Sequence, residues 1–109
     1  MTTVLTVPMD FTDEQRSIAA ECATKAGFKV VQILNEPAAA ILAYGLGQET
    51  PTAESITCLV FRCGGTSTSV SVARITSGFV TILGAVEKRV GGEDLTKVLA
   101  DFLAGEFQR

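Results

Sequence analysis

The sequence predicts an α/β fold in two parts, β-α-β-α followed by β-β-β-α. In residues 1–47, β-branched segments alternate with helical patterns, which is typical of parallel strands joined by crossover helices. In residues 56–109, short glycine-containing turns separate three strand-like segments, which favours an antiparallel meander before a last helix. The polar segment between them, residues 48–55 ("QETPTAES"), is the only candidate connection.

The first strand and helix have clear boundaries. "TVLTVPM" is rich in β-branched residues and predicts a strand that ends at Pro8. Thr12 precedes Gln15 by three residues, the spacing of a capping box, so a helix begins there. Apolar residues then recur at helical spacing until Gly27, which suits a helix end.

The second strand and helix follow directly. "FKVVQIL" is rich in valine and isoleucine and predicts a strand. In "NEPAAAILAYGLG", Pro37 suits the first position of a helix, and Gly45 or Gly47 ends it.

The second half predicts strands at residues 56–62, 67–75 and 79–86. In the middle strand, threonine and valine at 68, 70 and 72 alternate with serine at 67, 69 and 71, which predicts one covered face and one polar face.

The last helix is amphipathic, and acidic Glu93 and Asp94 suit its positive N-terminal end. Its apolar stripe is expected to be core, and consists of Leu95, Val98, Leu99, Phe102, Leu103 and Phe107.

Composition excludes several classes of function. The 109 residues are 47% hydrophobic with a net charge of −3, which suits one globular domain rather than a disordered chain. No basic stripe points to DNA or another nucleic acid, and no apolar run is long enough to span a membrane. The chain has no histidine, which excludes a Ser-His or Cys-His hydrolase within it. Three cysteines, an odd number without a disulfide framework, favour the cytosol and give no metal site.

The candidate functional motif is the Gly64–Gly65 turn in "FRCGGTSTS". Backbone amides at such a turn can approach a phosphate. A phosphate site that performs chemistry usually also has an acidic residue to hold a metal, but no Asp or Glu occurs from residue 55 to 86. A nucleotide site, a disabled one and a simple hairpin turn all remain open at this point.

A three-strand meander followed by a helix is how ribonuclease-H-like folds begin, and actin-like ATPases contain two such lobes in series. The sequence therefore predicts a partial actin-like ATPase fold. On this hypothesis residues 1–47 are the C-terminal part of lobe I, residues 48–55 the connection, and residues 56–109 the N-terminal part of lobe II.

Four motifs in order resemble the nucleotide-binding domain of the 70-kDa heat-shock chaperones, the DnaK-type family. They are "LTVPMDFTDEQR", "AGFKVVQILNEPAAAILAYGLG", "LVFRCGGTSTSVSV" and "VGGEDL". The family domain is several times longer, and also includes a first phosphate loop with a catalytic lysine and an adenine pocket.

The resemblance implies that ATP is the cofactor and gives roles to individual residues. Gly64 and Gly65 match the loop whose amides face the β- and γ-phosphates, and Glu36 matches an acid near the metal. Pro8 and Arg16 match residues that relay the nucleotide state, although Arg16 equally suits an exposed helix position. The expected ATP-binding residues are Glu36, Arg62, Gly64, Gly65, Thr66, Ser67, Gly92 and Glu93.

The chain also departs from the family pattern. Working members have acids where Arg62 and Ser69 stand, a third glycine at Thr66 and a threonine at Ser67. Both carboxylates that help to place a cation or the attacking water are absent, so no catalytic residue or metal ligand is assigned and magnesium support is doubtful. Three interpretations of Arg62 stay open: a solvated charge, a guanidinium that compensates phosphate charge, and an interlobe ion pair. Glu36 and Glu93 also suit the start of a helix.

Segments such as "LAYGLGQETPT" and "LAGEFQR" look most like a divergent cytosolic branch, the heat shock 70 kDa protein fourteen type. The resemblance implies a co-chaperone that acts with a J-domain partner on nascent chains at the ribosome. Weak or no ATP hydrolysis is expected. An active ATP-hydrolysing chaperone is the alternative, and a small-molecule kinase of the same superfold fits the motifs less well.

Overall fold

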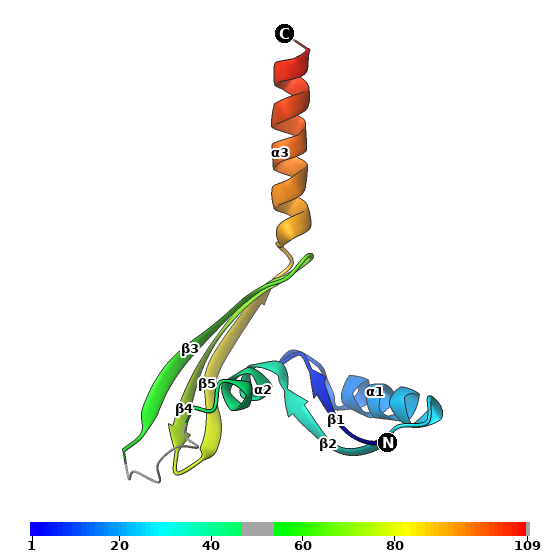
Figure 1. The fold of residues 1–109 in the computed structure, drawn as a ribbon, viewed down its shortest axis with the longest axis vertical. Coiled ribbons are helices and arrows are strands. Elements are labelled where there is room, and N and C mark those ends of the chain that lie inside the picture. Colours follow the sequence, from blue (N-terminus) through cyan, green and yellow to red (C-terminus); the bar gives the residue numbers. More distant parts are fainter. Residues whose placement is uncertain (47–53, 109) are drawn as a thin grey trace.

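The computed structural model describes residues 1–46 and 54–108, and its elements follow the predicted order (Figure 1). The first half contains β1 (Thr2–Val7), α1 (Asp13–Lys25), β2 (Lys29–Asn35) and α2 (Glu36–Ala43). The second half contains β3 (Ile56–Cys63), β4 (Thr68–Thr76), β5 (Phe79–Lys88) and α3 (Gly92–Phe107). The predicted α/β order of β-α-β-α and then β-β-β-α is confirmed.

Strands β1 and β2 pair in parallel, and α1 forms the crossover between them. The predicted capping box starts α1: the Gln15 amide donates to Thr12 Oγ1 at 3.2 Å, and the Thr12 amide donates to Gln15 Oε1 at 2.8 Å. Gly27 follows the helix with a φ of +92°, which glycine adopts at little cost. The sequence signals at both ends of α1 are therefore correct.

Helix α2 follows β2 without a loop, because Glu36 is its first residue. Pro37 is the second residue of the helix, one position after the predicted first position, and its missing N–H still leaves no helical hydrogen bond unmade. Of the two glycines expected to end the helix, Gly45 lies just beyond it with a φ of +69°. Gly47 and most of the predicted connection lie outside the described residues.

Strands β3, β4 and β5 form the predicted antiparallel meander. The tight turn between β4 and β5 uses positive φ angles at Ser77 (49°) and Gly78 (81°), the geometry that matches strand twist in a two-residue hairpin. The strands are one or two residues longer than their predicted C-terminal ends.

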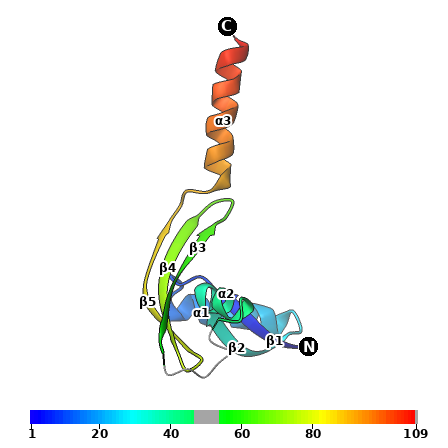
Figure 2. The same cartoon turned by 60° about the vertical axis from the view of Figure 1, so that its left-hand side comes forward.

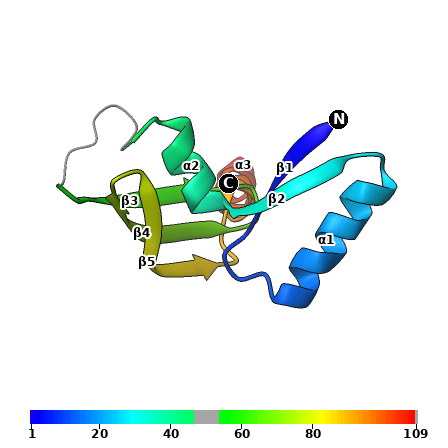
Figure 3. The same ribbon diagram turned by 90° about the horizontal axis from the view of Figure 1, so that it is seen from below.

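The core lies between α2 and one face of the meander (Figure 3). Ile41 of α2 is buried with Ala73 and Ile75 of β4, and partly buried side chains of β3 and β5 surround them. Ser71 on the same face is 2% exposed. The covered face of β4 is thus the one that carries Ser69 and Ser71, so the serines do not form a solvent-facing side.

The prediction that the apolar stripe of α3 is core is wrong for this structure. The helix extends away from both sheets (Figures 1 and 2). All six residues of the stripe are exposed, and Phe107 is 94% exposed. The amphipathic pattern is real, but no other described element reaches it.

The described chain is extended overall. Its radius of gyration is 18.5 Å, whereas a compact domain of this length has about 13 Å. Its accessible surface is 8077 Å², against about 5800 Å² for a compact protein of this mass. No helix in the described ranges is long and apolar enough to cross a membrane.

This surface predicts that the isolated 109-residue chain self-associates or depends on a partner, with marginal stability. The exposed stripe of α3 and the unpaired edge of β3 are the surfaces that drive association. Sedimentation velocity over a range of concentrations is expected to show concentration-dependent species. A monomer at all concentrations with a sharp cooperative melt would contradict this expectation.

Candidate functional site

The Gly64–Gly65 turn connects β3 to β4 and has free backbone donors. The Gly64 amide donates to the Ser67 carbonyl at 2.8 Å, which closes the turn. The amides of Gly65, Thr66 and Ser67 have no acceptor in the part of the chain that the structure describes. Three neighbouring free amides are suited to bind an anion, because such donors need no particular side chain.

The N-terminus of α3 docks on the carbonyl side of this turn. The Gly92 amide donates to the Gly64 carbonyl at 2.9 Å, and the Glu93 amide donates to the Gly65 carbonyl at 2.8 Å. The C=O and N–H groups of one trans peptide point in opposite directions. The free amides of Gly65 and Thr66 therefore point away from α3.

Gly91 makes this docking possible. A Cβ at this position would lie 2.5 Å from the Gly65 carbonyl oxygen and 2.6 Å from that of Gly64. Its own amide donates to the Asp94 carboxylate at 2.9 Å, which orients the first turn of the helix. Only glycine permits the two backbones to approach this closely.

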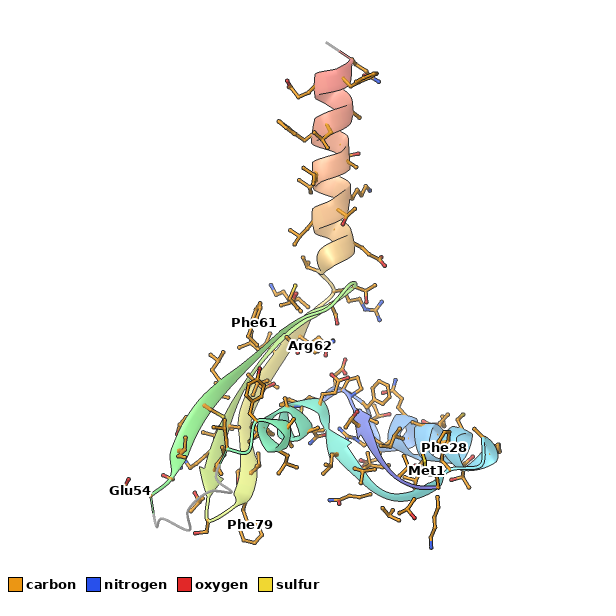
Figure 4. The ribbon with its side chains drawn as sticks, in the orientation of Figure 1. Met1, Phe28, Glu54, Phe61, Arg62 and Phe79 are labelled. Atoms are coloured by element: carbon orange, nitrogen blue, oxygen red, sulfur yellow. The ribbon has the colours of Figure 1, made fainter. Side chains whose placement is uncertain are left out.

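Arg62 lies two residues before the turn, where Figure 4 labels it. It lies among four polar side chains. Its Nε donates to Ser69 Oγ at 3.2 Å and lies 3.4 Å from Glu36 Oε2. Its Nη2 donates to Glu87 Oε1 at 3.0 Å and to Ser67 Oγ at 3.3 Å. Of the three interpretations left open by the sequence, a freely solvated charge does not fit these contacts.

Strand register explains this cluster. Arg62 of β3 is opposite Ser69 of β4, which is opposite Glu87 of β5, so the three side chains form a row across the meander. Glu36 reaches the row from the first residue of α2. Arg62 and Glu36 are 37% and 35% exposed, so their ion pair contributes only about 0–1 kcal/mol of stability. The main effect of the cluster is therefore to fix the orientation of the guanidinium, not to stabilise the fold.

Three clefts among the described residues adjoin the row, and the smallest, of about 200 Å³, is lined by Arg62 itself. One of about 250 Å³ is lined by the loop after β1, the start of α2, and residues of β4 and β5. A second of about 470 Å³ brings Pro8 and Asp10 opposite Thr66 and Ser67 of the turn. The turn and the loop after β1 therefore face a common space.

The described residues do not form a magnesium site of their own. The described residues contain no group of three or more acidic or other metal-ligating side chains. The two carboxylates nearest the turn, Glu36 and Glu87, both pair with the Arg62 guanidinium. Magnesium needs close octahedral oxygen ligands, and a fixed positive charge between the candidate ligands opposes it.

The structure brings the residues expected to bind ATP together around the turn. Glu36 and Arg62 pair, and the turn from Gly64 to Ser67 contacts Gly92 and Glu93. Pro8 lines the cleft beside the turn.

Arg16 is not simply an exposed helix residue. Its guanidinium donates to the carbonyls of Pro8, Met9 and Phe11 and so holds the loop that lines the cleft.

The sequence interpretation missed Glu87 and Asp10. Glu87 lies just beyond the acid-free stretch, and only the strand register places it beside Arg62. The lengths of the two hairpin turns fix this register, so they were the sequence signal that could have placed Glu87 beside Arg62. Asp10 gave no signal, because the loop and the turn are more than 50 residues apart in sequence.

Comparison with known proteins decides the family. The family model described as "Hsp70 protein" matches residues 1–109. The chain belongs to the Hsp70 family. The family implies an actin-like ATPase fold, of which these residues form a part.

Several curated relatives carry the name Heat shock 70 kDa protein 14. The chain is 48% identical to the protein from Bos taurus, and 47% identical to those from Homo sapiens and Xenopus tropicalis. Each match covers 107 residues, which is 97% of this chain and 21% of the relative. The chain thus spans about a fifth of the length of these Hsp70 proteins.

The docking of α3 predicts that two adjacent glycines differ in their tolerance of an alanine substitution. Gly91→Ala is expected to destabilise the fold by about 1–3 kcal/mol, because the new methyl group meets backbone carbonyls. Gly92→Ala is the matched control: its Cβ would have no neighbour closer than 3.7 Å, and alanine favours a helix. Urea unfolding measured at the same protein concentration compares the two variants. Equal stabilities would show that α3 does not dock on the turn.

Proposed function

We propose that this segment supplies the second phosphate-binding turn of an Hsp70-family protein that binds ATP but hydrolyses it weakly or not at all. The observation that carries the proposal is the turn itself: three free amides stand beside Arg62, whose guanidinium pairs with both nearby carboxylates. The donors for phosphate are retained, whereas the acids for a metal ion are engaged elsewhere.

Binding and turnover place different demands on this site. Ground-state phosphate binding needs donors and positive charge, which backbone amides and Arg62 supply. Hydrolysis needs a positioned water and metal ions on the transferring phosphoryl group. Arg62 and Ser69 stand where working members have acids and cannot ligate magnesium as carboxylates do. Loss of one such preorganised element typically costs on the order of 10²–10³ in rate.

A chimera tests this proposal in a complete domain. The chain replaces the matching segment of the bovine relative, and ATP binding and turnover are measured separately. We expect ATP to bind and turnover to be on the order of 10²–10³ slower than in a conventional member. The double variant Arg62→Asp with Ser69→Asp should raise turnover, provided that the other phosphate loop is intact.

The matched control is Arg74→Asp with Thr76→Asp, which makes the same charge change at the exposed far end of β4. It should leave turnover unchanged. Magnesium-dependent hydrolysis at a conventional rate by the unmodified chimera would favour the alternative, an active ATP-hydrolysing chaperone.

We further propose that the whole protein is a cytosolic co-chaperone in protein folding. Its partners would be a J-domain protein and the ribosome, with nascent chains as indirect clients. Similarity to the Heat shock 70 kDa protein 14 relatives and the substitutions at Arg62 and Ser69 support this role over that of an independent chaperone.

This role predicts that the chimera sediments with ribosomes only when its J-domain partner is present. A conventional Hsp70 serves as the control. Recovery of the chimera from cell extract in ribosome-free fractions alone, with no J-domain protein bound, would contradict the ribosomal role and leave ATP binding as a separate question.

A further inference from the structure

We propose that Arg62 is the built-in cation of the phosphate site, and that phosphate binding at the Gly64–Gly65 turn therefore does not require magnesium. The inference rests on the proposed ATP binding and adds how charge is neutralised there. Two of the interpretations left open by the sequence combine here, because one guanidinium forms the ion pairs and also presents a free edge to phosphate.

The guanidinium has one unoccupied nitrogen, and it faces the turn. Nε and Nη2 are used by the two glutamates and two serines. Nη1 has no acceptor among the described residues. Nη1 lies 3.4 Å from the position that a Cβ on Gly64 would take, so the missing side chain leaves it beside the turn. Its two N–H donors are available to a phosphoryl oxygen.

The charges around the turn make Arg62 necessary for an anion. Glu36 and Glu87 touch it, and Asp10 lines the neighbouring cleft. Arg89 is the basic residue that lines that cleft, and Arg62 adjoins it through its hydrogen bonds to Ser67 and Glu87. Without Arg62 the carboxylates would be unpaired and would repel phosphate. With it, they fix the orientation of the guanidinium.

Only arginine can bind the two glutamates and a phosphate at the same time. Its planar fork presents five N–H donors in a fixed geometry, so Nε and Nη2 can bind carboxylates while Nη1 binds phosphate. Lysine places one compact charge and cannot occupy these positions together. The ATP affinity of Arg62→Lys in EDTA should therefore lie between those of the unmodified chimera and Arg62→Gln.

The test measures ATP affinity of the chimera by calorimetry in excess magnesium and in EDTA. For the unmodified chimera, the ATP affinities in magnesium and in EDTA are expected to agree within about threefold. Arg62→Gln should weaken binding in EDTA by about 10- to 100-fold, the effect of losing a hydrogen bond to a charged group. Magnesium should partly restore it, because Glu36 and Glu87 are then free to hold a cation. Arg74→Gln, remote on β4, is the charge-matched control and should behave as the parent.

The outcomes separate the two proposals. Absence of ATP binding by the parent under both conditions would overturn the proposed function and this inference together. Binding that requires magnesium in the parent, or that ignores Arg62→Gln, would overturn this inference alone.

A second measurement does not depend on the folding of a variant. Inorganic tripolyphosphate is added in EDTA to the isotope-labelled chimera, and the Arg62 side-chain resonances are followed by NMR. They should shift in a saturable manner while those of Arg74 do not. No shift at Arg62 would overturn the inference.

Discussion

The packing of Ile41 against Ala73 and Ile75 is the contact on which the site depends. It is the centre of the small core, and it holds α2 against the meander. Because Glu36 is the first residue of α2, this packing also sets where its carboxylate lies. The ion pair with Arg62 is weak by itself at its degree of exposure. Its geometry therefore comes from apolar burial a turn and a half of helix away, rather than from charge.

The side chain at position 62 decides what Glu36 and Glu87 pair with. A carboxylate at position 62 would add to Glu36 and Glu87 and form an acidic cluster open to a metal ion. An arginine converts the same two glutamates into partners of a side chain. The free amides of the turn are untouched, because they belong to its backbone. The donors of the turn are therefore independent of the side chain at position 62.

The sequence predicted what local patterns control. The capping box at Thr12 and the strand order were readable because turn chemistry and periodicity are local signals. The prediction for α3 failed for a different reason. An amphipathic stripe indicates that one face of a helix packs against apolar side chains, but it does not indicate that the described chain provides them. The Arg62–Ser69–Glu87 row also escaped prediction, since it requires the register of two hairpins. Ser71 shows the limit of alternation, because a small hydroxyl residue fits beneath α2 where a polar side was expected.

The close approach of Gly91 to the turn has a mechanical consequence. Helix α3 is 16 residues long, which corresponds to about 24 Å, and within the described chain its hydrogen bonds to the sheet are those from Gly92 and Glu93. Within the described chain, the direction of the helix is therefore set at the glycine turn, which is the pivot for any change in its tilt. A tilt of about 10° at the pivot displaces the far end by about 4 Å. A change in the shape of the turn would displace Phe107 most, because this exposed aromatic residue lies at the far end of the helix.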